Sequence, residues 1–162
     1  MMENQTSAPK ITDPKMALQK AEQYCAYQER AQQEVRNKLY DWGLWPDAIE
    51  QIIANLIEGN FLNEERFARQ YAKGKFSQKG WGRIKIKQAL KFKRIPEKLI
   101  QKALKEIDGD DYTKRLSQII QKKEAVLDEK DAYKKRYKLQ QYALSRGFEN
   151  DLIADILNNS HL

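Results

Sequence analysis

The stretch that decides the fold is VRNKLYDWGLWPDAIEQII, residues 35–53. Its apolar residues recur three or four positions apart on both sides of Gly43, which predicts two amphipathic helices joined by a tight turn. Glycine is suited to end the first helix at this turn, and Pro46 is suited to the first turn of the second helix. The same pattern returns at residues 86–104 (IKQALKFKRIPEKLIQKAL) and 139–157 (LQQYALSRGFENDLIADIL), at offsets of 51 and then 53 residues.

These offsets leave room for one more helix ahead of each copy, so the sequence predicts three repeats of three short helices. We place the repeats at residues 15–59, 60–108 and 109–162, and we expect residues 1–14, a polar segment with two prolines, to be a disordered lead-in. Repeats of this size bury their apolar faces poorly alone, which favours tandem stacking. The expected fold is all-α, an elongated tandem array of three three-helix units. One compact helical bundle is the alternative, and the even spacing favours the array.

The composition narrows the class of protein. Of the 162 residues, 41% are hydrophobic and 33% are charged, with only 7 Gly and 4 Pro, which argues against a loop-rich all-β domain. No apolar run approaches the roughly 18 residues of a membrane span, and the polar N-terminus lacks the apolar centre of a signal peptide. We therefore expect a cytoplasmic protein without a transmembrane helix.

Few residues of this chain are suited to catalysis. The single cysteine, Cys25, excludes an internal disulfide and any zinc site built from cysteines. The single histidine, His161, is next to the last residue, which argues against Ser-His-Asp and Cys-His arrangements and HExxH metal sites. We expect no catalytic residue, no metal and no cofactor. An enzyme that uses lysines and carboxylates is the minority alternative.

Positive charge is concentrated in one part of the chain. Residues 66–96 contain no Asp or Glu but eleven Lys and Arg, whereas the whole chain has a net charge of +7, so the remainder is mildly acidic. A block of like charges repels itself, and contact with an anionic partner relieves this repulsion. A phosphate backbone, an acidic protein groove and an anionic membrane surface are the candidate partners. A solvated, lysine-rich helix surface is the alternative.

Four aromatic residues lie among these cations: Tyr71, Phe76, Trp81 and Phe92. Aromatic rings in a cationic groove are the stacking platforms of single-stranded nucleic-acid binders. We expect Tyr71 to be a core residue because Phe67 lies four positions before it, while Trp81, between two glycines, suits either role. The candidate residues of the partner-binding or nucleic-acid-binding face are Arg66, Arg69, Lys73, Lys75, Lys79, Trp81, Arg83, Lys85, Lys87, Lys91, Lys93 and Arg94.

Three other motifs have structural interpretations. Adjacent residues do not face each other on a helix, so Glu64 and Glu65 suit a helix start after Asn63 rather than acid–base catalysis. The segment DGDD (108–111) lacks the later ligands of a calcium loop, and we expect it to cap the next helix. Lysines and arginines after residue 113 are interrupted by acids, which indicates a solvated face rather than a second site.

The central residues resemble a known family. The segments NFLNEERFARQY (60–71), KGWGRI (79–84) and QAL (88–90) are similar to the central signature of the RecX regulatory proteins. Upstream, EVRNKL (34–39) with Gly43 is similar to the first repeat of that family, and RGF (146–148) is similar to its last. The resemblance spans about residues 20–157. It implies an all-α fold of tandem three-helix units.

The resemblance also implies a function and partners. RecX proteins are bacterial, cytoplasmic, non-enzymatic modulators of the recombinase RecA, with roles in homologous recombination, DNA repair and the SOS response. They bind within the groove of the RecA–DNA filament and inhibit strand exchange and ATP hydrolysis. We therefore expect a RecA filament as the partner, single- or double-stranded DNA as a further ligand, no membrane partner, and a monomeric chain. A general single-stranded nucleic-acid-binding protein is the alternative.

Three positions depart from the pattern of the family. Asn63 stands where an aspartate is usual, but its side chain can still cap a helix. Ala31 stands where a serine is common, so a helix-capping oxygen is missing, at a cost of ~1 kcal/mol. Arg94 stands where a glycine is usual, so we expect the second repeat to end its helix with a different C-cap. These departures concern local geometry and leave the expected partner unchanged.

Overall fold

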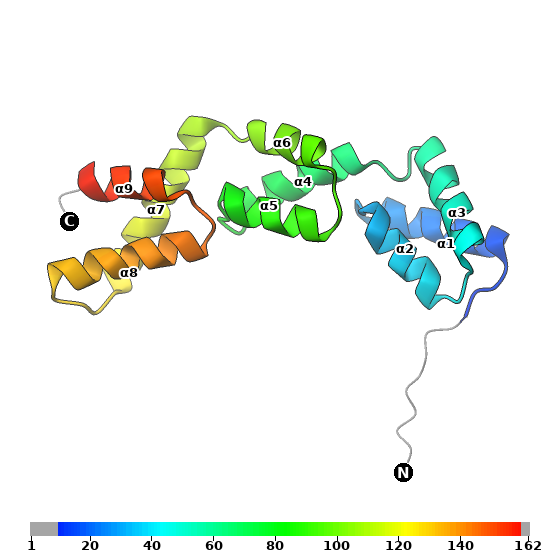
Figure 1. The fold of residues 1–162 in the computed structure, drawn as a ribbon, viewed down its shortest axis with the longest axis horizontal. Helices are drawn as coiled ribbons and strands as arrows, with labels where there is room; N and C mark the ends of the chain where they lie inside the picture. The colour runs from blue at the N-terminus through cyan, green and yellow to red at the C-terminus, as the bar shows by residue number, and fades with distance from the viewer. Residues whose placement is uncertain (1–9, 160–162) are drawn as a thin grey trace, which may run out of the picture. The chain divides into compact units, whose positions relative to one another are not determined.

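The computed structural model describes residues 10–159, and in this part of the chain all regular structure is α-helical (Figure 1). The helices form three consecutive groups of three, which confirms the all-α fold of tandem three-helix repeats. The chain divides into two compact units between Phe67 and Ala68, within α4. Among the described residues, no helix has both the length and the apolar character that crossing a bilayer requires. The helices are α1 (Pro14–Tyr27), α2 (Gln32–Asp41), α3 (Pro46–Glu58), α4 (Glu64–Ser77), α5 (Arg83–Phe92), α6 (Glu97–Lys105), α7 (Gly109–Val126), α8 (Ala132–Ser145) and α9 (Asn150–Asn159).

In the first compact unit, α1, α2 and α3 pack around one apolar core (Figure 1). Val35 and Leu39 of α2 are fully buried, and Ile52, Ile53 and Leu56 of α3 are at most 3% exposed. Their spacing of one, three or four residues places them on one face of each helix. Burial of each such side chain contributes roughly 1.5–3 kcal/mol. The shared apolar faces, more than helix propensity, therefore stabilise these short helices.

The expected disordered lead-in differs from the structure at its C-terminal end. Residues 1–9 lie outside the described residues, whereas residues 10–14 lead directly into the first unit. Ile11 is only 9% exposed, and its backbone N–H donates to the carbonyl oxygen of Trp42 at 2.8 Å. The side chain of Asp13 caps α1 through the N–H of Lys15 at 3.1 Å, and Pro14 occupies the first helical turn. The buried side chain of Ile11 and the helix start at Asp13 and Pro14 thus hold this segment against the first unit.

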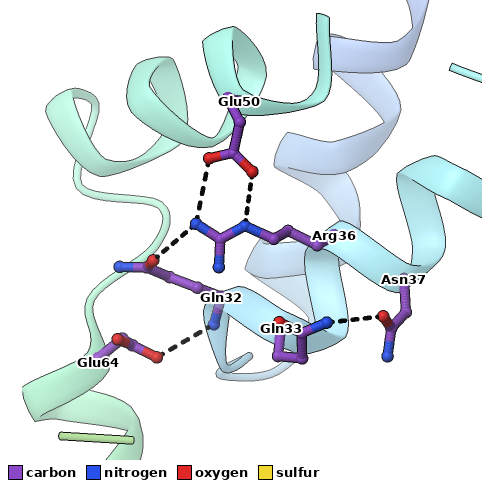
Figure 2. A network of polar contacts seen from close by, with 6 residues as sticks. All are labelled: Gln32, Gln33, Arg36, Asn37, Glu50 and Glu64. Atoms are coloured by element: carbon purple, nitrogen blue, oxygen red, sulfur yellow. Dashed lines mark hydrogen bonds and ion pairs between the residues drawn. The ribbon is translucent and has the colours of Figure 1, made fainter. Parts of the chain in front are cut away.

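A polar network joins α2, α3 and the start of α4 (Figure 2). Arg36 forms a bidentate ion pair with Glu50, with N–O distances of 2.8 and 3.2 Å, and also donates to the side-chain oxygen of Gln32 at 3.2 Å. The backbone N–H of Gln32 donates to Oε2 of Glu64 at 3.4 Å. Ala31, the N-cap of α2, provides no side-chain hydrogen bond. A carboxylate far along the chain therefore satisfies one first-turn N–H next to the residue that lacks a capping oxygen.

Two helix starts form as the sequence predicts. The side chain of Asn63 accepts a hydrogen bond from the backbone N–H of Arg66 at 2.9 Å, and two acidic residues occupy the first turn of α4. The side chain of Asp108 accepts from the N–H groups of Asp110 and Asp111 at 2.9 and 3.0 Å, which confirms the expected cap of α7. Both caps satisfy N–H groups that have no partner within their own helix.

The same turn ends the second helix of each repeat. Gly43, Arg94 and Gly147 all adopt a left-handed backbone, with φ angles of 97°, 61° and 94°. The expectation of a different C-cap at Arg94 is therefore wrong. The arginine takes the conformation that glycine takes in the other two turns, although this conformation costs a non-glycine residue roughly 1–2 kcal/mol. In each turn, the backbone N–H of the residue after the left-handed one donates a hydrogen bond to the carbonyl oxygen five positions earlier. These bonds join Leu44 to Leu39 (3.2 Å), Ile95 to Leu90 (3.1 Å) and Phe148 to Ala143 (3.3 Å).

In the second compact unit, the start of α5 joins α4–α6 to α7–α9. The first N–H groups of a helix lack partners within it, and Gly82, the N-cap of α5, has no side chain to supply one. The carbonyl groups of the turn that follows α8 and the hydroxyl of a buried tyrosine supply the acceptors instead. The backbone N–H of Gly82 donates to the carbonyl oxygen of Arg146 (2.8 Å), and that of Ile84 donates to the carbonyl oxygen of Gly147 (3.0 Å). The backbone N–H of Arg83 donates to the hydroxyl oxygen of Tyr112 (2.9 Å).

Tyr112 lies at the centre of this junction and is fully buried. Its hydroxyl donates to Oε1 of Glu149 at 2.5 Å. Its ring packs against Phe76 and Phe148, with centroid distances of 5.7 and 5.1 Å, and the guanidinium carbon of Arg83 lies 3.8 Å from the ring centroid. Burial, reinforced by the hydrogen bond to Glu149, raises the pKa of Tyr112 far above its usual value. The hydroxyl therefore stays protonated and keeps donating at any physiological pH.

Candidate functional site

Lysine and aromatic side chains alternate in space across α4 and α5 of the second compact unit. The ammonium nitrogen of Lys75 lies 5.4 Å from the ring centroid of Tyr71 and 4.8 Å from that of Trp81. Lys85 lies 4.6 Å from the Trp81 ring, and Lys93 lies 5.8 Å from the Tyr71 ring. The order is therefore Lys93, Tyr71, Lys75, Trp81, Lys85. We call these five residues the lysine–aromatic ladder.

Local structure explains how the chain assembles the ladder. Tyr71 and Lys75 are one helical turn apart on α4, so they share a face. After α4, Gly80 adopts a left-handed backbone with φ 66°, and the N–H of Trp81 bonds to the carbonyl oxygen of Lys75 at 3.0 Å. This bond folds Trp81 back beside the end of α4. Lys85 is in the first turn of α5, and Lys93, at the C-cap of α5, completes the ladder at its other end.

The aromatic residues of this region differ in burial. Phe67 is a core residue at 5% exposure, whereas Tyr71 is half-buried rather than fully buried as expected. Trp81 is also half-buried, so it is neither an interior residue nor fully open to solvent. Phe76 packs against Tyr112. Phe92 is 90% exposed and directly precedes Lys93 in the chain.

Three of the candidate arginines form ion pairs with glutamates. Arg66, in the first compact unit, pairs with Glu29 at 2.5 Å and also donates to Asn60. Arg69 pairs with Glu106 at 2.9 Å, and Arg83 pairs with Glu149 at 3.0 Å in the junction around Tyr112. These arginines have structural partners, and an incoming anion has to compete with a carboxylate for each of them.

Two candidate lysines share one glutamate. Lys87 and Lys91 lie 3.0 and 3.7 Å from the carboxylate oxygens of Glu97. Hydrogen bonds from Gln101 and Lys87 hold the pKa of Glu97 below its usual value, so Glu97 is ionised at neutral pH. Glu97 comes directly after the acid-free segment and neutralises part of its charge.

The remaining lysines carry the net positive charge of the site. No carboxylate among the described residues forms an ion pair with Lys73, Lys75, Lys79 or Lys85. Lys75 and Lys85 belong to the ladder, whereas Lys73 and Lys79 are exposed on either side of the end of α4. An ammonium group is a compact donor for phosphate or carboxylate oxygens. The attraction between a lysine ammonium group and an aromatic ring is worth about 0.5–1 kcal/mol at an exposed site. This attraction favours positions of Lys75 and Lys85 over the rings.

The sequence alone did not identify the glutamates that form ion pairs with some of the candidate cations and leave others unpaired. Glu29, Glu106 and Glu149 lie outside the acid-free segment, and only the tertiary structure brings them to Arg66, Arg69 and Arg83. Arg115 and Arg146, which lie against the turn at Gly80, were also missed. The described residues contain no cluster of three His, Cys, Asp or Glu side chains with the arrangement of a metal site.

These features define a class of protein: an all-α protein of tandem three-helix repeats that carries a lysine-rich, aromatic-interleaved surface. Models of the first, second and third three-helix domains of RecX match residues 17–56, 63–104 and 110–157, respectively. The chain therefore belongs to the RecX family of regulatory proteins.

Individual relatives agree with this assignment. The chain is 32% identical over 139 residues to "Regulatory protein RecX" of Clostridium perfringens (strain 13 / Type A), with coverage of 82% of this chain and 65% of the relative. The chain thus spans about two thirds of the length of that relative. It is 27% identical over 147 residues to the protein of the same name from Prosthecochloris aestuarii (strain DSM 271 / SK 413), with coverage of 91% and 95%. The crystal structure of RecX from Lactobacillus salivarius is similar with a TM-score of 0.81 and 25% identity, over 90% of this chain and 94% of that one.

Proposed function

We propose that this chain binds the filament that RecA forms on DNA and inhibits its strand exchange and ATP hydrolysis. In this role it is a cytoplasmic regulator of recombination and DNA repair that acts by binding and not by catalysis. The observation that carries the proposal is the lysine–aromatic ladder, a cationic surface without a neutralising carboxylate at Lys75 and Lys85, in a chain of the RecX family.

The ladder has the chemistry that such a partner requires. A nucleoprotein filament presents phosphate groups and acidic side chains, and ammonium groups bind both. The rings of Tyr71 and Trp81 hold Lys75 between them, so less side-chain freedom is lost when an anion binds. Contact with the filament needs only surface complementarity, which agrees with the scarcity of residues suited to catalysis.

The first test is ATP hydrolysis by RecA on single-stranded DNA, titrated with this chain from below to above one molecule per RecA protomer. Inhibition at substoichiometric amounts supports the proposal, because one molecule then affects several protomers or stops filament growth. Inhibition only with excess chain on limiting DNA indicates competition for DNA. No effect at any ratio overturns the proposal.

A matched pair of double variants tests whether the ladder is the binding surface. Lys75→Gln with Lys85→Gln removes two ladder cations, whereas Lys87→Gln with Lys91→Gln removes two cations that Glu97 already neutralises in part. We expect the first variant to weaken filament binding roughly five- to tenfold, because each exposed contact of a lysine with an anion contributes up to about 1 kcal/mol. The second variant should change binding less than about threefold. Equal effects would remove the ladder from the interface.

A general single-stranded nucleic-acid-binding protein is the second candidate. It is favoured by Phe92, which directly precedes Lys93 and whose 90% exposed ring is open to base stacking. Affinity for a bare oligothymidine, measured by fluorescence anisotropy, discriminates the two candidates. A filament regulator should bind the filament far more tightly than the bare strand, whereas a general binder should bind both alike. Phe92→Ala should weaken binding to the bare strand only in the second case.

A further inference from the structure

Two arginines from the last repeat converge on the turn between α4 and α5. Arg115 is on α7, and Arg146 is the C-cap of α8. A Cβ atom at Gly80 would lie 3.1 Å from Nη2 of Arg146 and 3.4 Å from Nη2 of Arg115. Both guanidinium groups therefore lie against the same glycine. Nη2 of Arg146 donates to the carbonyl oxygen of Lys79, which anchors this arginine to the turn.

These guanidinium groups have unpaired donors. Nε of Arg115 and Nε of Arg146 are both buried without a hydrogen-bond partner. Within residues 10–159, Arg115 forms neither a hydrogen bond nor an ion pair through its side chain. Buried polar atoms in proteins nearly always have a partner, and a partly buried charge is favourable only beside an opposite charge. The arginine pair therefore has the electrostatics of an anion site.

A small hollow of about 150 Å³ lies beside the pair. It contains the side chains of Arg115, Arg146 and a third cation, Lys122, together with one amide, one phenol and one aliphatic side chain. No carboxylate lines it. Glu124, two residues after Lys122 on α7, is not part of the lining and forms an ion pair with Lys135 at 2.9 Å. The full lining is Arg115, Gln118, Ile119, Lys122, Tyr142 and Arg146.

We propose that this hollow binds a phosphate group, supplied by the backbone of a nucleic-acid strand. Two guanidinium forks and one ammonium offer donors from several directions, which matches the tetrahedral oxygens of phosphate. A planar carboxylate is satisfied by a single arginine fork, so an acidic peptide is the less suitable ligand. Gly80 favours this geometry, since its left-handed backbone (φ 66°) would strain any other residue and a Cβ there would push the guanidinium of Arg146 back by a few tenths of an ångström.

The site is separate from the lysine–aromatic ladder but shares one turn with it. Trp81 of the ladder directly follows Gly80, against which both arginines lie. A strand bound by the arginine pair at Gly80 therefore passes next to Trp81, over which Lys75 and Lys85 lie. The proposal does not depend on RecA and is tested without it. It also replaces the interpretation of the basic C-terminal residues as a purely solvated face.

The test uses the full chain and nuclear magnetic resonance of the arginine Nε–H groups. The wild-type protein is titrated separately with inorganic phosphate and with a 20-nucleotide oligothymidine. We expect the Nε–H resonances of Arg115 and Arg146 to shift with the oligonucleotide, at lower concentrations than with free phosphate. Shifts with free phosphate alone assign the site to a small phosphate anion and overturn the nucleic-acid source. Shifts with neither probe, or only with an oligoglutamate peptide, overturn the phosphate site.

Adjacent residues provide a matched control. Arg115→Gln and Lys114→Gln each remove one positive charge from the same turn of α7, but Lys114 is exposed and does not line the hollow. We expect Arg115→Gln to weaken oligothymidine binding about tenfold and Lys114→Gln about twofold or less. Equal losses overturn the proposal. Melting curves check that both variants fold, and if Arg115→Gln does not, the wild-type resonance titration decides alone.

Discussion

The backbone of Gly82 lies directly against that of Gly147, 65 positions later in the chain. A Cβ at Gly82 would lie 2.2 Å from the carbonyl oxygen of Gly147, closer than any real contact permits. The same two segments are joined by hydrogen bonds from the N–H of Gly82 to Arg146 and from the N–H of Ile84 to Gly147. The close approach therefore allows carbonyl groups of the turn after α8 to accept hydrogen bonds from N–H groups at the start of α5, and both glycines are required for it.

Gly82→Ala should loosen this junction. Because the obstructing atoms belong to the backbone, we expect a loss of roughly 1–3 kcal/mol in the free energy of unfolding, measured by urea denaturation and circular dichroism. Gly74→Ala is the control, since Gly74 lies inside α4 with no atom within 4 Å of a Cβ at that position. Gly74→Ala should raise the free energy of unfolding by about 0.5–1 kcal/mol. Equal and small effects of the two substitutions would mean that the junction opens readily.

Arg94→Gly should stabilise the chain. Arg94 is in the left-handed conformation, which costs a non-glycine residue about 1–2 kcal/mol. Glycine avoids this cost, but its greater conformational freedom in the unfolded state offsets part of the benefit. We expect a net gain of roughly 0.5–1 kcal/mol in the free energy of unfolding. Lys93→Gly is the control, because Lys93 is the adjacent residue and has an ordinary φ of −82°. This substitution should lower the free energy of unfolding by about 0.5–1 kcal/mol. A loss of stability in Arg94→Gly would show that contacts of the arginine side chain outweigh the backbone strain.

Glu64 and Glu50 should have opposite effects on the pH dependence of stability. Burial raises the pKa of Glu64, against the opposing effects of the Gln32 N–H and of Arg36, whereas the hydrogen bond from Arg36 lowers the pKa of Glu50 (Figure 2). A raised folded-state pKa means that the contribution of Glu64 is present at low pH and is lost as the pH rises through that pKa. A lowered pKa means that the contribution of Glu50 is present above the ordinary carboxyl pKa and is lost as the pH falls.

The glutamine variants test these signs. Relative to the wild type, Glu64→Gln should gain stability between about pH 4 and pH 7, since glutamine cannot ionise and its oxygen still accepts from Gln32. Glu50→Gln should lose stability over the same range. Urea denaturation at several pH values measures both. If Glu64→Gln instead loses stability as the pH rises, attraction to Arg36 exceeds the cost of burying the carboxylate.

Cys25 should be almost unreactive in the folded chain. The residue is 5% exposed in the first compact unit, and burial raises its pKa to about 11. Because only the thiolate reacts, alkylation by iodoacetamide at pH 8 should be on the order of 100-fold slower than in denaturant. The labelling rate should rise with urea as the unit opens. Native-state labelling at the rate of a free cysteine would show that α1 separates from the core on the time scale of the reaction.

The ladder should make binding to DNA-containing partners sensitive to salt. Each phosphate contact on a single strand steepens the slope of log K against log salt concentration by about 0.7. Lys75→Gln with Lys85→Gln should therefore reduce the slope by about 1.4 if both lysines contact phosphate. Lys87→Gln with Lys91→Gln should leave it nearly unchanged, because Glu97 pairs with both lysines. A lower affinity with an unchanged slope would instead indicate contact with acidic protein.

Most of the fold could be predicted from the sequence because helical periodicity is local. Apolar residues three and four positions apart placed the buried faces of α2 and α3, and the repeated turn pattern placed Gly43, Arg94 and Gly147 in equivalent positions. The conformation of Arg94 was not predicted, since residue type alone argues against a left-handed arginine. Packing of the helices on both sides of the turn imposes that conformation.

The sequence by itself determined that this is an all-α chain of three helical repeats with one acid-free, cationic segment. Only the tertiary structure decided which of those cations remain available. Arg66 pairs with Glu29, 37 residues away, and Arg83 with Glu149, 66 residues away. The tertiary fold also brings Arg115 and Arg146 to one glycine. Spacing along a helix encodes neighbours three or four residues apart, whereas ion pairs across such distances exist only after the repeats have packed.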